Sequence, residues 1–190
     1  MSMTVKRRKE DRTPHYIQHR IADIRGGVSI KASELGGDYL PEGAVLSAPD
    51  TTGICHVVKI AEVAAEVAAA DTTIKVKKLH NLKVGDFITP ALKGKAYAIT
   101  AIDGSNKEYD TLTVGTALGA IVLGAHVVEA KEESADNKSM LKYEPKAING
   151  TGKSVDPKSN LDTDAWLFAV TKGLKLPTFI ASKLTGIINY

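Results

Sequence analysis

Few residues in this 190-residue chain are of a type and spacing that could do chemistry. Cys55 and His56 are neighbours in the run GICHVVKI. Successive side chains of a strand point to opposite faces, so these two would not form a nucleophile–base pair. A lone cysteine in such an apolar run is typical of a small buried side chain, and we predict that role for Cys55.

The segment AINGTGKS, residues 147–154, ends like a phosphate-binding P-loop in Gly152-Lys153-Ser154. That motif also needs a glycine five positions before Gly152, where this chain has Ala147. The surrounding sequence shows no alternation of strands and helices typical of a parallel α/β sheet. We therefore interpret the segment as a polar loop.

The remaining candidates are pairs without a third partner. His15 and His19 have the spacing of two metal ligands on a helix, but no third ligand is evident, and a solvated face explains them better. Asp103 and Asp110 flank a polar turn, where carboxylates commonly bond to the backbone. The sequence predicts no catalytic residue, no metal site and no cofactor, and hence a protein that is not an enzyme.

Composition and charge narrow the class of protein. Hydrophobic residues make up 43% of the chain, enough for a core, whereas aromatic residues make up only 5%, too few for a base-stacking platform. The net charge is +3, and residues 1–25 hold seven basic and three acidic side chains, or +4, which leaves −1 for the rest. The positive charge is thus a property of an N-terminal arm.

Other features exclude several further classes. A single cysteine cannot form an internal disulfide. No segment has the apolar length of a membrane span, and no apolar stretch follows the N-terminal charges as it would in a signal peptide. We expect a protein made and kept in a cytoplasm, or built into something assembled there.

The elements that must position these residues are predicted from periodicity. Residues 1–27 are interpreted as a basic arm followed by a short amphipathic helix, because Ile17, Ile21 and Ile24 are spaced by four and three, and Gly26 follows them. Residues 28–130 show short apolar runs separated by turn residues, which indicates a β-barrel body or a sandwich. Residues 61–70 fit either a helix or a strand, and we favour the strand.

The stretch TTIKVKKLHNLKVGDFI, residues 72–88, is the clearest local signal. It predicts a strand, a turn and a second strand, with Gly85 at positive φ and the Asp86 carboxylate bonded to a nearby backbone N–H.

Residues 131–190 are expected to form a loop-rich segment that packs on the body or on a neighbour. This segment should contain a strand at AWLFAVTKG and a short helix after Pro177. The predicted fold class is mainly β: a small β-barrel or sandwich, an N-terminal extended arm with a short helix, and a short C-terminal helix.

Four segments resemble the head-fibre and capsid-decoration proteins of tailed bacteriophages. They are Val84-Gly85-Asp86, the strand from Tyr97 to Asp103, the strand from Tyr109 to Gly115, and Leu176-Pro177. The resemblance covers roughly residues 40–128 and 165–190, and it does not include residues 1–25. It implies a structural virion protein present in many copies on the outside of a capsid shell, with the major capsid protein as its partner. It also implies a homo-oligomer, and among fibre-bearing relatives a trimer.

We expect residues 1–25 to dock the protein on the shell and the location to be the capsid surface of a virion assembled in the host cytoplasm, with no membrane involved. The candidate docking residues are basic and apolar side chains of this region: Lys6, Arg7, Arg8, Lys9, Arg12, Ile17 and Ile21. The alternative is a small nucleic-acid-binding β-barrel with a basic arm, whose affinity would fall steeply with salt. The few aromatic residues and the neutral-to-acidic body argue against this alternative.

Overall fold

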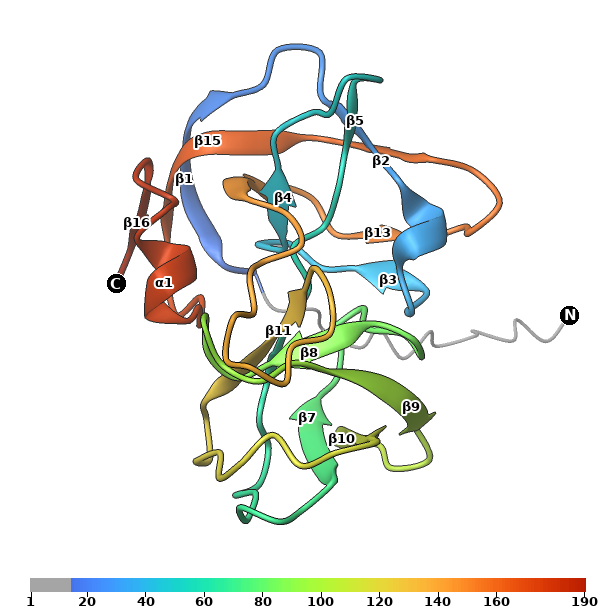
Figure 1. Ribbon diagram of the computed structural model, residues 1–190. Coiled ribbons are helices and arrows are strands. Elements are labelled where there is room, and N and C mark those ends of the chain that lie inside the picture. The colour runs from blue at the N-terminus through green and yellow to red at the C-terminus, as the bar shows by residue number, and fades with distance from the viewer. Residues whose placement is uncertain (1–14) are drawn as a thin grey trace, which may run out of the picture.

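The computed structural model describes residues 15–190, and this part of the chain is mainly β, as predicted. The strands form two groups, which Figure 1 shows one above the other. The lower group is a six-stranded sheet in the order β6 (Ile60–Glu62), β11 (His126–Ala130), β8 (Phe87–Thr89), β9 (Tyr97–Asp103), β10 (Tyr109–Val114) and β7 (Thr73–Lys77).

The upper group is built around a five-stranded sheet. Its order is β1 (Ile17–Asp23), β15 (Ala165–Thr171), β12 (Pro145–Asn149) and β4 (Val45–Ser47), and β16 (Ile187–Asn189) pairs with β15 in parallel. Two smaller sheets lie beside it: β14 (Leu161–Thr163) with β2 (Val28–Ile30) and β5 (Ile54–Cys55), and β13 (Lys153–Ser154) with β3 (Tyr39–Leu40). The helical elements are a 3-10 turn, Ala32–Glu34, and α1, Thr178–Ala181.

The six-stranded sheet is an open ladder, and no closed barrel forms within the described residues. A bridge between Val63, just after β6, and Val76 of β7 brings the two edge strands of the sheet together. The strands of this sheet share an apolar core that includes Ile74, Ile88 and Leu112, all buried. On β7, buried Ile74 and Val76 alternate with exposed lysines. This alternation is the reason that the strand could be predicted from the sequence.

The predicted N-terminal helix is wrong: the residues form β1, which pairs antiparallel with β15. The helical spacing has another cause, because β1 carries three register irregularities. Each such bulge reverses the side-chain alternation of a strand. Ile17 and Ile24 therefore both pack against the core although they are seven residues apart. The basic arm of residues 1–14 lies outside the described residues.

Other local predictions are confirmed. Residues 61–70 contain no helix: β6 is followed by isolated bridges at Val63 and Val67, with bends at residues 64–65 and a turn at residues 69–70. The run AWLFAVTKG forms β15, and a short helix follows Pro177. Strands from residues 131–190 pair with earlier strands, β12 with β4 and β15 with β1.

Candidate functional site

The two predicted docking residues within the described chain, Ile17 and Ile21, lie on β1 and differ in exposure. Ile17 is half-buried against the core, whereas Ile21 is exposed. The start of β1 is fixed to the body because the backbone N–H groups of Tyr16 and Ile17 each donate to a Glu42 carboxylate oxygen at 2.7 Å. The other five predicted docking residues lie outside the described part: Lys6, Arg7, Arg8, Lys9 and Arg12.

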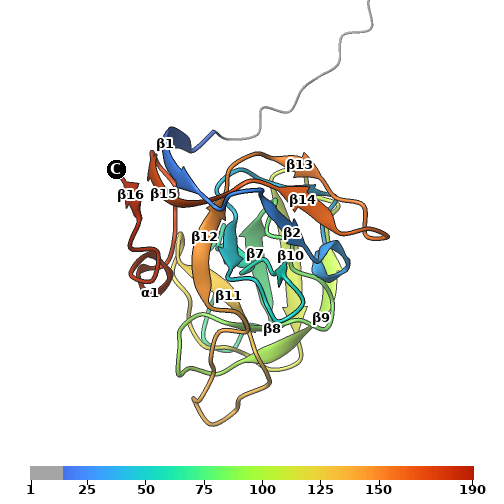
Figure 2. The ribbon, with the colours of Figure 1, turned by 90° about the horizontal axis from the view of Figure 1, so that it is seen from above.

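Ile21 belongs to a group of exposed apolar side chains that we call the apolar edge patch: Ile21 (61% exposed), Phe168 (52%), Ile188 (61%) and Tyr190 (66%). Ile21, Phe168 and Ile188 lie on the adjacent strands β1, β15 and β16, and Tyr190 directly follows β16. Phe168 lies opposite Ala22 of β1, and Ile188 lies opposite Val170 of β15. Figures 1 and 2 both show β1, β15 and β16 together at one side of the molecule. Grouped exposed apolar side chains are typical of interaction surfaces.

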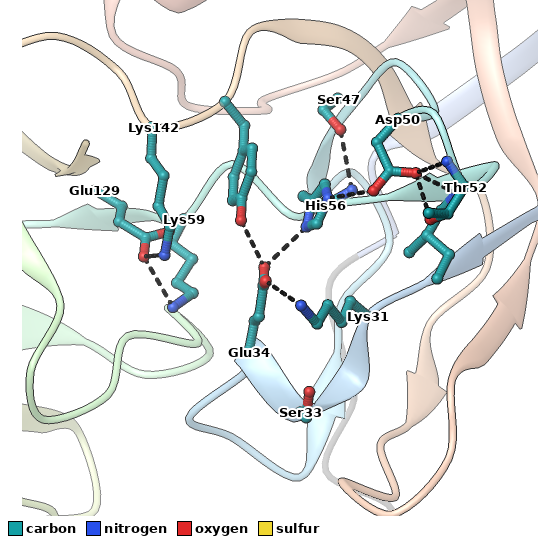
Figure 3. Close-up of polar contacts among 12 residues, drawn as sticks. Lys31, Ser33, Glu34, Ser47, Asp50, Thr52, His56, Lys59, Glu129 and Lys142 are labelled. Carbon is teal, nitrogen blue, oxygen red and sulfur yellow. Dashed lines mark hydrogen bonds and ion pairs between the residues drawn. The ribbon is translucent and has the colours of Figure 1, made fainter.

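A second candidate is a polar cluster around His56 (Figure 3). The His56 Nδ1 lies 2.9 Å from Glu34 Oε2, and its Nε2 lies 3.5 Å from Asp50 Oδ2. The imidazole stacks on Tyr143 with ring centroids 4.1 Å apart, and the Tyr143 hydroxyl donates to the same Glu34 oxygen at 3.0 Å. Each polar atom of the imidazole thus has a partner within the protein.

Electrostatics around His56 match this geometry. Burial raises the pKa of Glu34, but hydrogen bonds from His56, Tyr143 and Lys31 outweigh it, so the pKa is lowered overall. The pKa of Asp50 is lowered to about 2, first by the Thr52 side chain and then by the backbone N–H of Ile54. Both carboxylates therefore remain ionised at neutral pH.

The His56 cluster does not hold an activated nucleophile. Ser47 Oγ accepts from the backbone N–H of His56, at 3.0 Å, and donates to the Ala48 carbonyl, so its hydroxyl is already engaged. Cys55 is fully buried, as predicted, and burial raises the pKa of its thiol, with Asp50 adding to the rise. A protonated, enclosed thiol is inert. The arrangement ties the 3-10 turn to β5 and to Tyr143.

A third cluster, formed by Lys59, Asp86, Glu129 and Lys142, is more deeply buried than the His56 cluster. The Lys59 Nζ lies 2.5 Å from Asp86 Oδ2 and 3.3 Å from Glu129 Oε1, and Lys142 Nζ donates to the same Glu129 oxygen at 2.7 Å. Asp86 also accepts from the backbone N–H of Lys83 at 2.9 Å. Figure 3 shows Lys59 and Lys142 converging on Glu129. Our sequence analysis predicted only the backbone bond of Asp86. The available signal was a charged residue inside each of two apolar runs, HVVKIAEV and HVVEA.

Two further sequence predictions concern polar pairs. Asp103 accepts from the backbone N–H of Ser105 at 3.0 Å, as turn chemistry requires. Asp110 instead forms an ion pair with Lys78, and its Oδ2 lies 3.1 Å from His80 Nε2. His15 contacts Glu42, and within residues 15–190 no group of three metal-ligating side chains occurs.

The described chain contains no helix long and apolar enough to cross a membrane. No family model matches the chain, and no curated protein or solved structure matches it significantly.

Proposed function

We propose that this protein is a structural component of a phage virion, attached to the outside of the capsid shell through its N-terminal region and the apolar edge patch. The observation that carries the proposal is the position of this patch. It includes Ile21 of β1, the strand that directly follows the basic segment of residues 1–14. Positive and apolar groups are thereby adjacent in the chain, and together they can form one docking surface.

The resemblance to head-fibre and decoration proteins supports the same proposal, because the segments that carry it lie on elements that build the body. Val84-Gly85-Asp86 forms the turn before β8, and the segments beginning at Tyr97 and Tyr109 form β9 and β10. A protein repeated on a lattice needs only a modest contact area per copy, since weak contacts add through multivalency. A homo-oligomer, with a trimer favoured, would increase the number of contacts made at once and so strengthen binding to the lattice further.

The inward orientation of the polar clusters also supports a structural role. His56, Glu34 and Tyr143 bond to one another, and Glu42 caps the start of β1. These contacts hold loops and strands in place and leave the apolar edge patch as the surface suited to a partner. We therefore place the docking function on β1, β15 and β16.

The test uses the full-length chain and capsids of the encoding phage that lack this protein. Deleting residues 1–25 would remove β1 from its sheet, so substitutions are the better design. We expect Phe168→Ser with Ile188→Ser to reduce co-sedimentation with capsids at least tenfold. Val122→Ser with Leu123→Ser, which removes comparably exposed apolar side chains outside the patch, is the matched control and should bind normally. Equal binding by both double variants would overturn the assignment of the patch.

The basic segment is tested separately. Replacing Lys6, Arg7, Arg8 and Lys9 with serine should weaken capsid binding and make it less sensitive to salt, because fewer charges are screened. Binding of the unaltered chain to duplex DNA, with release on raising the salt, would instead favour the nucleic-acid alternative.

A further inference from the structure

Lys59, Asp86 and Glu129 form a closed group of ionisable side chains within the β structure. Their side chains are 1%, 4% and 2% exposed. They come from three neighbouring strands: Lys59 immediately precedes β6, Asp86 immediately precedes β8, and Glu129 lies on β11 between them. The group therefore links two strands across the strand that separates them.

Burying these three charged side chains lowers the stability of the folded protein unless their mutual interactions compensate for the lost hydration. Removing a carboxylate and an ammonium from water costs several kcal/mol per ion, and the mutual attraction recovers this only with good geometry and full hydrogen bonding. Here the Oε2 atom of Glu129 is buried without a partner. Burial raises the pKa of Glu129 above its usual value, although Lys59 and Lys142 oppose the rise. Glu129 thus has a buried carboxylate oxygen without a partner, and this atom can accept a proton.

We propose that Lys59 and Asp86 condense to an intramolecular isopeptide bond between Lys59 Nζ and Asp86 Cγ, and that Glu129 transfers the protons. The two reacting groups are already in contact, with 2.5 Å between Nζ and Oδ2 and the carboxyl carbon one bond beyond. Holding two reacting groups in contact raises their effective concentration, because the entropy of bringing them together has already been lost on folding.

The reaction balances without any other reactant. In the first step, Lys59 transfers a proton to Asp86, which gives a neutral amine and a neutral carboxylic acid. The nitrogen lone pair of Lys59 then attacks Cγ of Asp86, and a C–N bond forms. Glu129 accepts a proton from that nitrogen and returns it to the departing hydroxyl oxygen, the C–O bond breaks, and one water leaves.

Neighbouring backbone groups hold the reacting atoms in place. The Lys83 N–H donates to Asp86 Oδ2 at 2.9 Å, which orients the carboxyl group toward Lys59. The backbone N–H of Glu129 donates to the Lys59 carbonyl at 3.0 Å, which fixes the base beside the amine. Gly85, at φ +94°, permits the turn that presents Asp86. Lys142 also bonds to Glu129, but its side chain is partly exposed, so Lys59 is the enclosed amine.

The experiment is intact-mass spectrometry of the full-length chain under denaturing conditions. We expect the purified protein to lack the mass of one water relative to its sequence, and tandem spectra of a digest to show a branched peptide joining Lys59 to Asp86. Lys59→Arg and Glu129→Gln should each restore the full mass. Glu62→Gln, which removes a carboxylate from two more accessible lysine pairs, is the matched control and should keep the loss.

A water loss could also arise from a succinimide at Asp103-Gly104. Persistence of the loss in Lys59→Arg, with the modified peptide located at Asp103, would overturn the proposal. Full mass in the folded, unaltered protein after prolonged incubation at neutral pH would overturn it as well. Both results are independent of capsid binding, so they do not bear on the proposed function. They also require no variant to fold.

Discussion

At the scale of single residues, the most constrained ionisable group outside the Lys59 cluster is His80. Its Nδ1 accepts from the backbone N–H of Leu82 at 3.0 Å, and its Nε2 lies 3.1 Å from Asp110 Oδ2. This geometry requires the neutral imidazole with its proton on Nε2. Burial lowers the pKa of His80, and Asp110 only partly opposes the shift. Protonation would therefore break the bond to Leu82.

His80 should make folding stability depend on pH. Its pKa in the folded state is below the ordinary value of 6.5, so the unfolded chain binds the proton more readily. The stabilising contribution is present above pH 6.5 and is lost as the pH falls through the folded pKa. We expect urea unfolding to show lower stability at pH 5 than at pH 7.5. His80→Gln should flatten this dependence, whereas His19→Gln on the exposed face of β1 should leave it unchanged.

Glu34 should cause a second loss of folding stability, at a more acidic pH than the loss caused by His80. Replacing it with glutamine removes the negative charge of the group that His56 and Tyr143 share and should cost about 1–3 kcal/mol at pH 7. Because the pKa of Glu34 is lowered in the folded state, its stabilising effect is present above pH 4.5 and is lost as the pH falls further. Denaturant titrations from pH 7 to pH 3 should therefore show the two proteins converging. A constant difference would contradict this account.

Some of these residue contacts were readable in the sequence and others were not. Cys55 was predicted from its apolar neighbours, and the Asp86 bond from its place after Gly85, because both depend on local sequence. The meeting of Lys59, Asp86 and Glu129 depends on three strands far apart in the chain. No local pattern reports such a meeting, although a charge in an apolar run was the available sign.

At the scale of elements, the turn before β8 is held by backbone geometry. Gly85 has φ +94°, a region that costs L-residues about 1–2 kcal/mol, and a Cβ built there meets no atom within 4 Å. Gly85→Ala should therefore destabilise the protein by about that amount through strain alone. Gly115→Ala, at a glycine without positive φ and with only ordinary contact to Thr100, should change stability much less. Chemical denaturation of both variants measures the difference.

The segment predicted as an N-terminal helix is the strand β1. The isoleucine spacing favoured a helix, but pairing with β15 decided the structure, and bulges concealed the strand period. Arg20 shows how closely the strand is tied to the body: its guanidinium lies 5.5 Å from the Trp166 ring centroid and donates to the Gly150 carbonyl at 3.0 Å. Neither contact could be foreseen from residues 15–25 alone.

At the scale of the whole molecule, the chain runs from the upper sheets through the six-stranded sheet and back (Figure 1). The mainly β class was predictable from short apolar runs and turn residues. The order of strands was not, because β1 and β15 are separated by more than a hundred residues and pair through contacts that the local pattern does not encode.

An isopeptide bond would stabilise this whole arrangement. Residues 59 and 86 are 27 positions apart (86 − 59), and closing a loop of that size stabilises the folded state by about 3.5 kcal/mol on the chain-entropy model used for disulfides. For a domain of this size that corresponds to about 10 °C in Tm. Thermal unfolding of Glu129→Gln should show a loss of this order, whereas Glu62→Gln should lose much less, since it removes only exposed ion pairs. Equal Tm values for the two variants would contradict the stabilising role.

The most direct test of the proposed virion role is one mixing experiment with the full-length chain. It is incubated with capsids that lack the protein and with duplex DNA, at low and at physiological salt, and then sedimented. We predict that the chain sediments with the capsids at both salt concentrations and that added DNA does not compete. A chain that remains in the supernatant with DNA, and is released from it as salt rises, would contradict the assignment to the capsid surface.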